Sequence, residues 1–212
     1  MKVVQPTVMS VAGAVERAAA VAAALDALAA GRPVGVPTDT VYGLAAAASD
    51  EQAVERLFRL KQRPAERSIA VIVADTAAAA QLVEFDGSAG RLAERFWPGP
   101  LTIVATRTPS APVHLGKGST IGVRLPDDAI MQAIAAPRPL AVTSANLHGS
   151  PTPTTAQGVA DLLPDLGLVI DGGARGVASS TVVDVTGPVP EILREGPVSL
   201  EEISEAVAES PG

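Results

Sequence analysis

The chain has 212 residues, a formal net charge of -7 and no cysteine. Lack of cysteine excludes disulfides, thiol catalysis and zinc-thiolate sites, and the acidic net charge disfavours long-range attraction of a nucleic-acid backbone. With three Phe, one Trp and one Tyr the chain cannot form a broad base-stacking surface, so we expect its ligands to be small. Because the chain has no signal-peptide core and no long apolar run, we expect a cytoplasmic protein.

The first elements in the chain are a helix, a strand and a second helix. Residues 11–30 carry apolar side chains at helical spacing and stop before Gly31, a usual helix terminator. The stretch 32–38, RPVGVPT, is typical of a short buried strand. Ser49 and Gln52 then form a capping-box pattern, which predicts the start of the second helix.

Strands and helices alternate along the rest of the chain. Further strands are predicted at 68–74, 100–106, 119–126, 138–146, 167–173 and 180–187. Further helices are predicted near 76–84, 88–96, 127–136, 155–163 and 199–209. This order indicates an α/β fold with a twisted, mixed sheet and flanking helices. We find no linker or repeat, so we expect one domain over residues 1–212 with a loose C-terminal tail.

One segment concentrates cations in this acidic chain. It contains Arg56, Arg59, Lys61, Arg63 and Arg67. Cations near a helix C-terminus explain such a cluster without any ligand. Because Pro64 ends the helix, however, Lys61 and Arg63 fall on a turn, where both can point at one phosphate group.

A second polar cluster follows the strand predicted at 138–146. The stretch 142–155, VTSANLHGSPTPTT, places hydroxyl and amide groups where open α/β sheets bind ligands. The same residue types are also the usual components of turns. The sequence leaves both interpretations open.

Two arginines belong to apolar strands. Arg124 stands inside GVRLP, and Arg194 ends EILR. A buried arginine needs an internal carboxylate or an anionic ligand as its partner, and together with the Lys61 segment these two indicate a cationic cavity. The standard nucleotide motifs are absent, so any ATP must bind in another way. His114 and His148 have no acid beside them in sequence and are interpreted as loop residues.

Eight motifs, taken in order, resemble those of the YrdC-like family of threonylcarbamoyl-adenylate synthases. They are PTDTVYGL, KQRP, FWPGPLT, GVRLP, TSAN with SPTPT, IDGG, STVVDV and LREG. The resemblance covers about residues 15–205 and implies a YrdC-like twisted sheet around a concave basic cavity, in the short form without a further C-terminal domain.

The resemblance also implies an activity. Members join L-threonine, bicarbonate and ATP, with Mg²⁺ carried by ATP and no protein-bound metal, to give threonylcarbamoyl-AMP and diphosphate. This nucleotidyltransferase product is handed to a threonylcarbamoyl transferase complex that makes t6A at position 37 of tRNA; direct RNA binding would be weak, and no membrane is involved.

Individual residue roles follow from the resemblance alone. Those matching the catalytic set around the ATP phosphates are Lys61, Arg63, Ser144 and Asn146. Those matching other ATP contacts are Thr120, Thr152 and Arg194. Those matching the threonine site are Thr40, Tyr42, Arg124, Val142 and Ser180. The hydroxyls and the tyrosine of PTDTVYGL would then line a pocket for a small polar amino acid, while Asp39 has no role beyond capping or pairing with a cation.

The sequence departs from the family pattern near the threonine site. Arg67 and Ser68 replace the usual Asn-Pro pair, and Ile72 replaces a histidine; GVASST is one residue longer than usual, so either Ser179 or Ser180 fills the threonine position. Two alternatives therefore stay open. One is a paralogue with the same ATP cavity but another acceptor, or a threonylcarbamoyl-AMP hydrolase. The other is a module that binds double-stranded RNA by shape.

Overall fold

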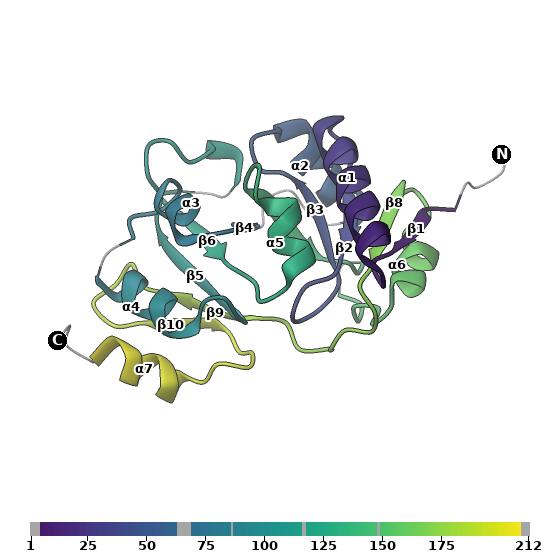
Figure 1. Cartoon of the computed structure of the whole chain (residues 1–212). Helices are drawn as coiled ribbons and strands as arrows, with labels where there is room; N and C mark the ends of the chain where they lie inside the picture. Colours follow the sequence, from purple (N-terminus) through teal and green to yellow (C-terminus); the bar gives the residue numbers. More distant parts are fainter. Residues whose placement is uncertain (1–4, 63–68, 86, 116–117, 148, 209–212) are drawn as a thin grey trace.

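The computed structural model describes residues 5–62, 69–85, 87–115, 118–147 and 149–208 (Figure 1). In this part of the chain, one mixed sheet has the strand order β1-β8-β2-β3-β7-β4-β6-β5-β9-β10. The strands are β1 (Thr7–Ser10), β2 (Val34–Val36), β3 (Gly43–Ala47), β4 (Ala70–Ile72), β5 (Leu101–Thr106), β6 (Thr120–Arg124), β7 (Leu140–Ser144), β8 (Leu168–Asp171), β9 (Thr181–Asp184) and β10 (Glu191–Arg194). The predicted α/β class with a mixed sheet is confirmed.

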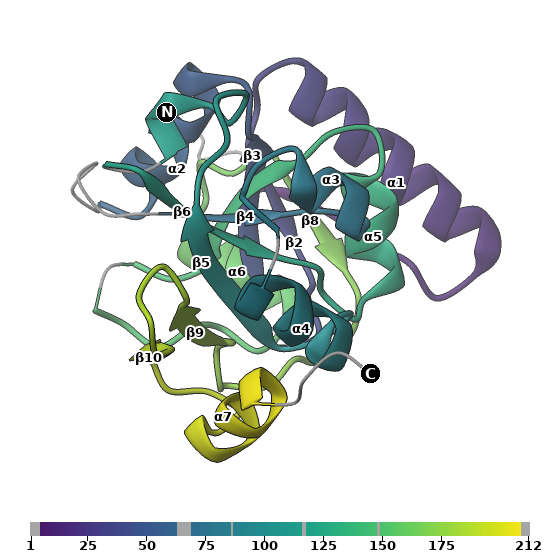
Figure 2. The ribbon, with the colours of Figure 1, turned by 90° about the vertical axis from the view of Figure 1, so that its left-hand side faces the viewer.

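Helices pack on both faces of this sheet. They are α1 (Ala14–Ala29), α2 (Glu51–Leu60), α3 (Thr76–Ala80), α4 (Gly87–Phe96), α5 (Ala129–Ala135), α6 (Ala156–Leu162) and α7 (Leu200–Ala208), with a 3-10 turn at Val113–Leu115. Helices α1 and α5 share one core cluster, and the others bury their apolar sides in a second one. Figure 2 shows α4 and α7 together beside β9 and β10. None of the helices in the described ranges is long and apolar enough to span a bilayer.

Alternation along the strands assigns the two clusters to opposite faces. In β3, Leu44 and Ala46 belong to one cluster, and Ala45 between them belongs to the other. The cluster under α1 and α5 takes its strand residues from β2, β3, β4, β7 and β8. Strands β5, β6 and β9 contribute no residue to this cluster among those described, so α1 and α5 leave their side of these three strands open. The cavity described below lies there.

Two strands were not expected from the sequence, and one predicted helix cap is wrong. Strand β3, GLAAA, follows Tyr42 and was not expected because alanine favours helices; all five residues are buried between β2 and β7, so small side chains at the sheet centre outweigh propensity. Strand β1 is short and lies at the sheet edge. Helix α2 is capped by Asp50, not Ser49: Asp50 Oδ1 accepts a hydrogen bond from Ala53 N at 3.0 Å.

Candidate functional site

A cavity of about 310 Å³ opens over the middle of the sheet. Its floor includes a row of neighbouring side chains, Ile72 on β4, Arg124 on β6, Thr102 on β5 and Val182 on β9. Alternation places these residues on the face that α1 and α5 cover farther along the sheet. The cavity is therefore built by the strands themselves, at the side of the sheet that those helices leave open.

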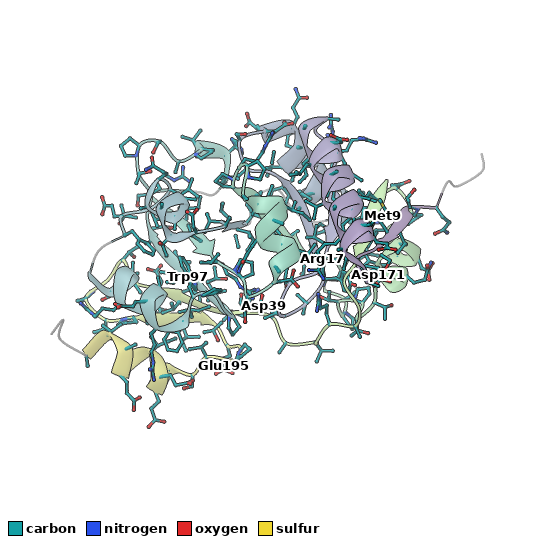
Figure 3. All side chains as sticks on the ribbon, viewed as in Figure 1. Met9, Arg17, Asp39, Trp97, Asp171 and Glu195 are labelled. Atoms are coloured by element: carbon teal, nitrogen blue, oxygen red, sulfur yellow. The ribbon has the colours of Figure 1, made fainter. Side chains whose placement is uncertain are left out.

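Arg124 is buried, as its place in an apolar strand predicts, and its partner is an internal carboxylate. Its guanidinium donates to Asp39 Oδ1, to Thr40 Oγ1 at 3.1 Å, and through Nε to Gly99 O at 3.0 Å. Figure 3 shows Asp39 at the lower middle of the molecule, below α5. Burial lowers the pKa of Arg124, and the Asp39 carboxylate opposes that shift, so the guanidinium stays charged.

These contacts also explain the polar PTDTVYGL stretch. Thr38 Oγ1 donates to Val41 O at 2.6 Å and accepts from Thr40 N and Val41 N, which closes a tight turn. That turn holds Asp39 and Thr40 against Arg124. Three of the five guanidinium donors are thus used by described residues, leaving one N–H on each terminal nitrogen for a ligand at the cavity.

Two hydroxyls and a second arginine lie beside Arg124. Thr102 Oγ1 and Ser180 Oγ are 2.9 Å apart, and Arg194 donates to Ser180 Oγ at 2.9 Å and to Ser180 O at 2.8 Å. Arg194 itself is exposed, in contrast to the expectation of a buried side chain. Gly196 allows the close approach of this segment, because a Cβ there would lie 2.3 Å from Thr181 N.

A third polar group lies at the opposite end of the cavity, where β7 ends. Lys61, the last-turn cap of α2, is 2% exposed and donates to Ser144 O and to Asn146 Oδ1, the latter at 2.7 Å. Ser144 Oγ donates to Asn146 Oδ1 at 2.5 Å. The two polar segments around residues 61 and 144 thus meet in space, beside the cavity that Ser144 lines.

The structure brings most of the proposed site residues to one cavity. Among those implied by the resemblance, the lining includes Thr40, Thr120, Arg124, Val142, Ser144, Ser180 and Arg194. Both Ser179 and Ser180 line it, as does Ile72. Lys61 and Asn146 reach it through Ser144. Arg63, Arg67 and Ser68 lie outside the described residues.

Two predicted positions are not in the lining. Tyr42 is fully buried in the core on the opposite face, and its hydroxyl donates to Gly173 O at 2.8 Å and lies 3.5 Å from Asp171 Oδ1. Tyr42 therefore does not line this cavity, and its hydroxyl contacts the turn after β8. Thr152 is likewise absent from the lining residues.

Two polar lining residues were not expected from the sequence. Thr102 is 3% exposed and hydrogen-bonded to Ser180, and Asp184 places a carboxylate at the β9 end of the cavity. Both follow alternation in strands, and a polar residue at an inward position was the signal that could have identified them. Among the charged lining residues, Asp184 offsets part of the charge of Arg124 and Arg194, so a uniformly basic cavity remains an expectation.

No metal cluster accompanies this cavity in the described ranges. No group of three or more His, Cys, Asp or Glu side chains that could hold an ion occurs there. His114, interpreted as a loop residue, lies in the 3-10 turn, with Nε2 2.8 Å from Ala48 O. His148 lies outside the described residues.

Comparison with known proteins identifies the fold and its relatives. The Sua5/YciO/YrdC family model, described as telomere recombination, matches residues 26–196. The threonylcarbamoyl-AMP synthase of Pyrococcus abyssi is 41% identical over 185 residues, 84% of this chain and 54% of that protein. A protein of Mycobacterium tuberculosis is 36% identical over 91% of both chains.

Solved structures agree with these matches. The P. abyssi Sua5 complexed with L-threonine has a TM-score of 0.88 at 38% identity, over 96% of this chain and 61% of that one. Escherichia coli YciO has a TM-score of 0.84 at 28% identity, over 94% of this chain and 99% of that one. The chain thus spans just over half of the Pyrococcus protein and nearly all of the mycobacterial one.

Proposed function

The chain belongs to the Sua5/YciO/YrdC family, and from that premise we propose that it is a threonylcarbamoyl-AMP synthase that uses the cavity over β4, β6, β5 and β9. The observation that carries the proposal is the pairing of two polar ends in one cavity. Arg124, Thr40 and Ser180 form one end, and Ser144 with Lys61 behind it forms the other.

The Arg124 end suits an amino acid. Two N–H groups of a guanidinium match a carboxylate, and a guanidinium held by Asp39, Thr40 and Gly99 needs little reorganisation to bind one. Thr40 and Ser180 supply hydroxyls beside it. The P. abyssi structure with bound L-threonine supports threonine as the amino acid.

The Lys61 end suits phosphates. Lys61 Nζ now donates to neutral oxygens of Ser144 and Asn146, and phosphate oxygens are stronger acceptors for an ammonium group. We infer that Lys61, Arg63, Ser144 and Asn146 hold the phosphates of ATP, which enters as its Mg²⁺ complex. Thr120 and Arg194, which also line the cavity, would contact the rest of the nucleotide.

The chemistry then follows from position and charge. The amine of threonine adds to the carbon of bicarbonate-derived CO₂ to give a carbamate, and a carbamate oxygen attacks the α-phosphorus of ATP as diphosphate leaves. Because the carbamate is a weak nucleophile, the site contributes mainly by alignment and by neutralising the charge that develops on the phosphates. Lys61, Arg63 and Arg194 provide that neutralisation.

The product is a mixed anhydride, and such a reactive compound needs a nearby enzyme that uses it. We propose that it passes to a threonylcarbamoyl transferase complex that modifies tRNA. The test of the whole proposal is incubation of the protein with MgATP, threonine and carbon-labelled bicarbonate. The labelled carbon should enter an adenylate only when threonine is present. An adenylate without the label, or no adenylate product at all, would overturn the proposed activity.

A further inference from the structure

One row of side chains places chemically opposite groups on the two sides of Arg124. Ile72 on β4 pairs with Arg124 in the parallel β4–β6 ladder. Thr102 on β5 faces Arg124 from the other side, one position beyond the Ile103–Val123 pair. Neighbouring strands are about 4.8 Å apart, so Ile72 and Thr102 lie roughly 10 Å from each other across Arg124. Both residues line the cavity.

Thr102 and Ser180 together always offer one hydroxyl proton to a ligand. Two hydroxyls have two donors and four lone pairs. Their mutual hydrogen bond uses one donor and one lone pair, and Arg194 uses a second lone pair, on Ser180. Whichever hydroxyl donates within the pair, one O–H and two lone pairs are left over by these contacts. A ligand hydroxyl could both accept from and donate to this pair.

Ile72 offers the opposite chemistry. It is 3% exposed, has no hydrogen-bonding group in its side chain, and packs with the core under α1 and α5. A polar group pressed against it would lose its water without gaining a partner, whereas a methyl group would be buried favourably.

We propose that Thr102 and Ile72 are the residues that select the acceptor, by reading the two substituents on its β-carbon. With the carboxylate on Arg124, the β-hydroxyl turns toward Thr102 and Ser180, and the methyl turns toward Ile72. L-allo-threonine exchanges these two groups, valine lacks the hydroxyl and serine lacks the methyl. The inference rests on the proposed synthase function and names the side chains that restrict its amino acid.

The test compares specificity, not total activity. The kcat/KM of diphosphate release from MgATP and bicarbonate is measured with L-threonine, L-allo-threonine, L-serine and L-valine. Thr102→Val should reduce the preference for threonine over valine about 10- to 100-fold, because the unpaired donor that penalises valine is partly removed. Ile72→Ala should reduce the preference for threonine over serine roughly 4- to 10-fold, the effect of one buried methyl group.

Matched variants separate specificity from folding. Thr102→Ser keeps the hydroxyl and should retain the preference over valine. Thr106→Val makes the same change on the same strand outside the cavity lining and should change nothing. If Thr102→Val does not fold, as judged by loss of ATP binding, Thr102→Ala makes the same comparison.

The outcomes for the two proposals are distinct. Unchanged preferences in folded Thr102 and Ile72 variants would overturn this inference while the synthase function stands. No threonine-dependent release by the wild-type protein would instead overturn the proposed function, and the selectivity argument with it.

Discussion

Asp39 and Arg124 are 85 positions apart in sequence and form an ion pair at the edge of the cavity, with side chains only 12% and 6% exposed. Asp39 is thus the internal carboxylate that a buried arginine in an apolar strand requires. The pair fixes the guanidinium in place before any ligand arrives.

Removing Asp39 should destabilise the fold. Asp39→Ala leaves a buried positive charge without its carboxylate, which costs about 3 kcal/mol in the free energy of unfolding. Urea denaturation measures the loss. Asp39→Asn, which keeps an acceptor oxygen but no charge, should lose less, and an Asp39→Ala protein as stable as wild type would contradict the structural role of the pair.

Removing Arg124 should affect one substrate and not the other. Arg124→Ala should weaken threonine binding by about 2 to 4 kcal/mol and leave ATP binding unchanged, because the ammonium and hydroxyl groups at the Lys61 end are intact. Calorimetry with each substrate measures both affinities. Arg175→Ala is the matched control, since Arg175 pairs with Asp128 outside the cavity lining; equal threonine affinity in the two variants would show that Arg124 is not the carboxylate site.

The buried tyrosine should make stability fall at alkaline pH. Burial and the nearby Asp171 carboxylate raise the pKa of Tyr42 above 10.0. A raised folded-state pKa means that this contribution to stability is complete below pH 10.0 and is lost as the pH rises from there through the folded-state pKa. Tyr42 is the only tyrosine, so absorbance of tyrosinate follows it alone.

Tyr42→Phe supplies the comparison. It should lose about 1 kcal/mol at neutral pH with the hydrogen bond to Gly173, and its unfolding free energy should depend less on pH above 10 than that of the wild type. A Tyr42 that ionises at or below its usual pKa would show that the hydroxyl is not held in the observed contacts.

The helix cap gives a local test. Asp50→Ala should cost about 1 kcal/mol of stability, because Ala53 N loses its acceptor at the start of α2. Ser49→Ala should cost much less. Thermal unfolding of both variants makes the comparison, and the reverse order would restore the capping box expected from Ser49 and Gln52.

Strands with a strong hydrophobic pattern could be predicted from the sequence. A strand whose conformation depends on its neighbours in the sheet could not. The positions of β5 to β9 follow from Val- and Ile-rich runs, but β3 is an alanine run whose conformation is set by β2 and β7 on its two sides. Local pattern carries no information about those neighbours.

The same limit applies to the site. The sequence indicated that Arg124 needs a partner but could not choose between Asp39 and a ligand, since their meeting depends on the tertiary turn made by Thr38. The family resemblance implies a pocket role for Tyr42, yet this residue is buried in the core of the opposite face. Thr102 became visible only when the strand register set it beside Arg124.

The most direct measurement is diphosphate release from MgATP by the wild-type protein and by Lys61→Met, with threonine and bicarbonate each omitted in turn. We expect release by the wild type only when both are present, and none by Lys61→Met, because the replacement removes the buried ammonium beside Ser144. Release that ignores threonine or bicarbonate, or that survives the loss of Lys61, would contradict the assignment of synthase activity to this cavity.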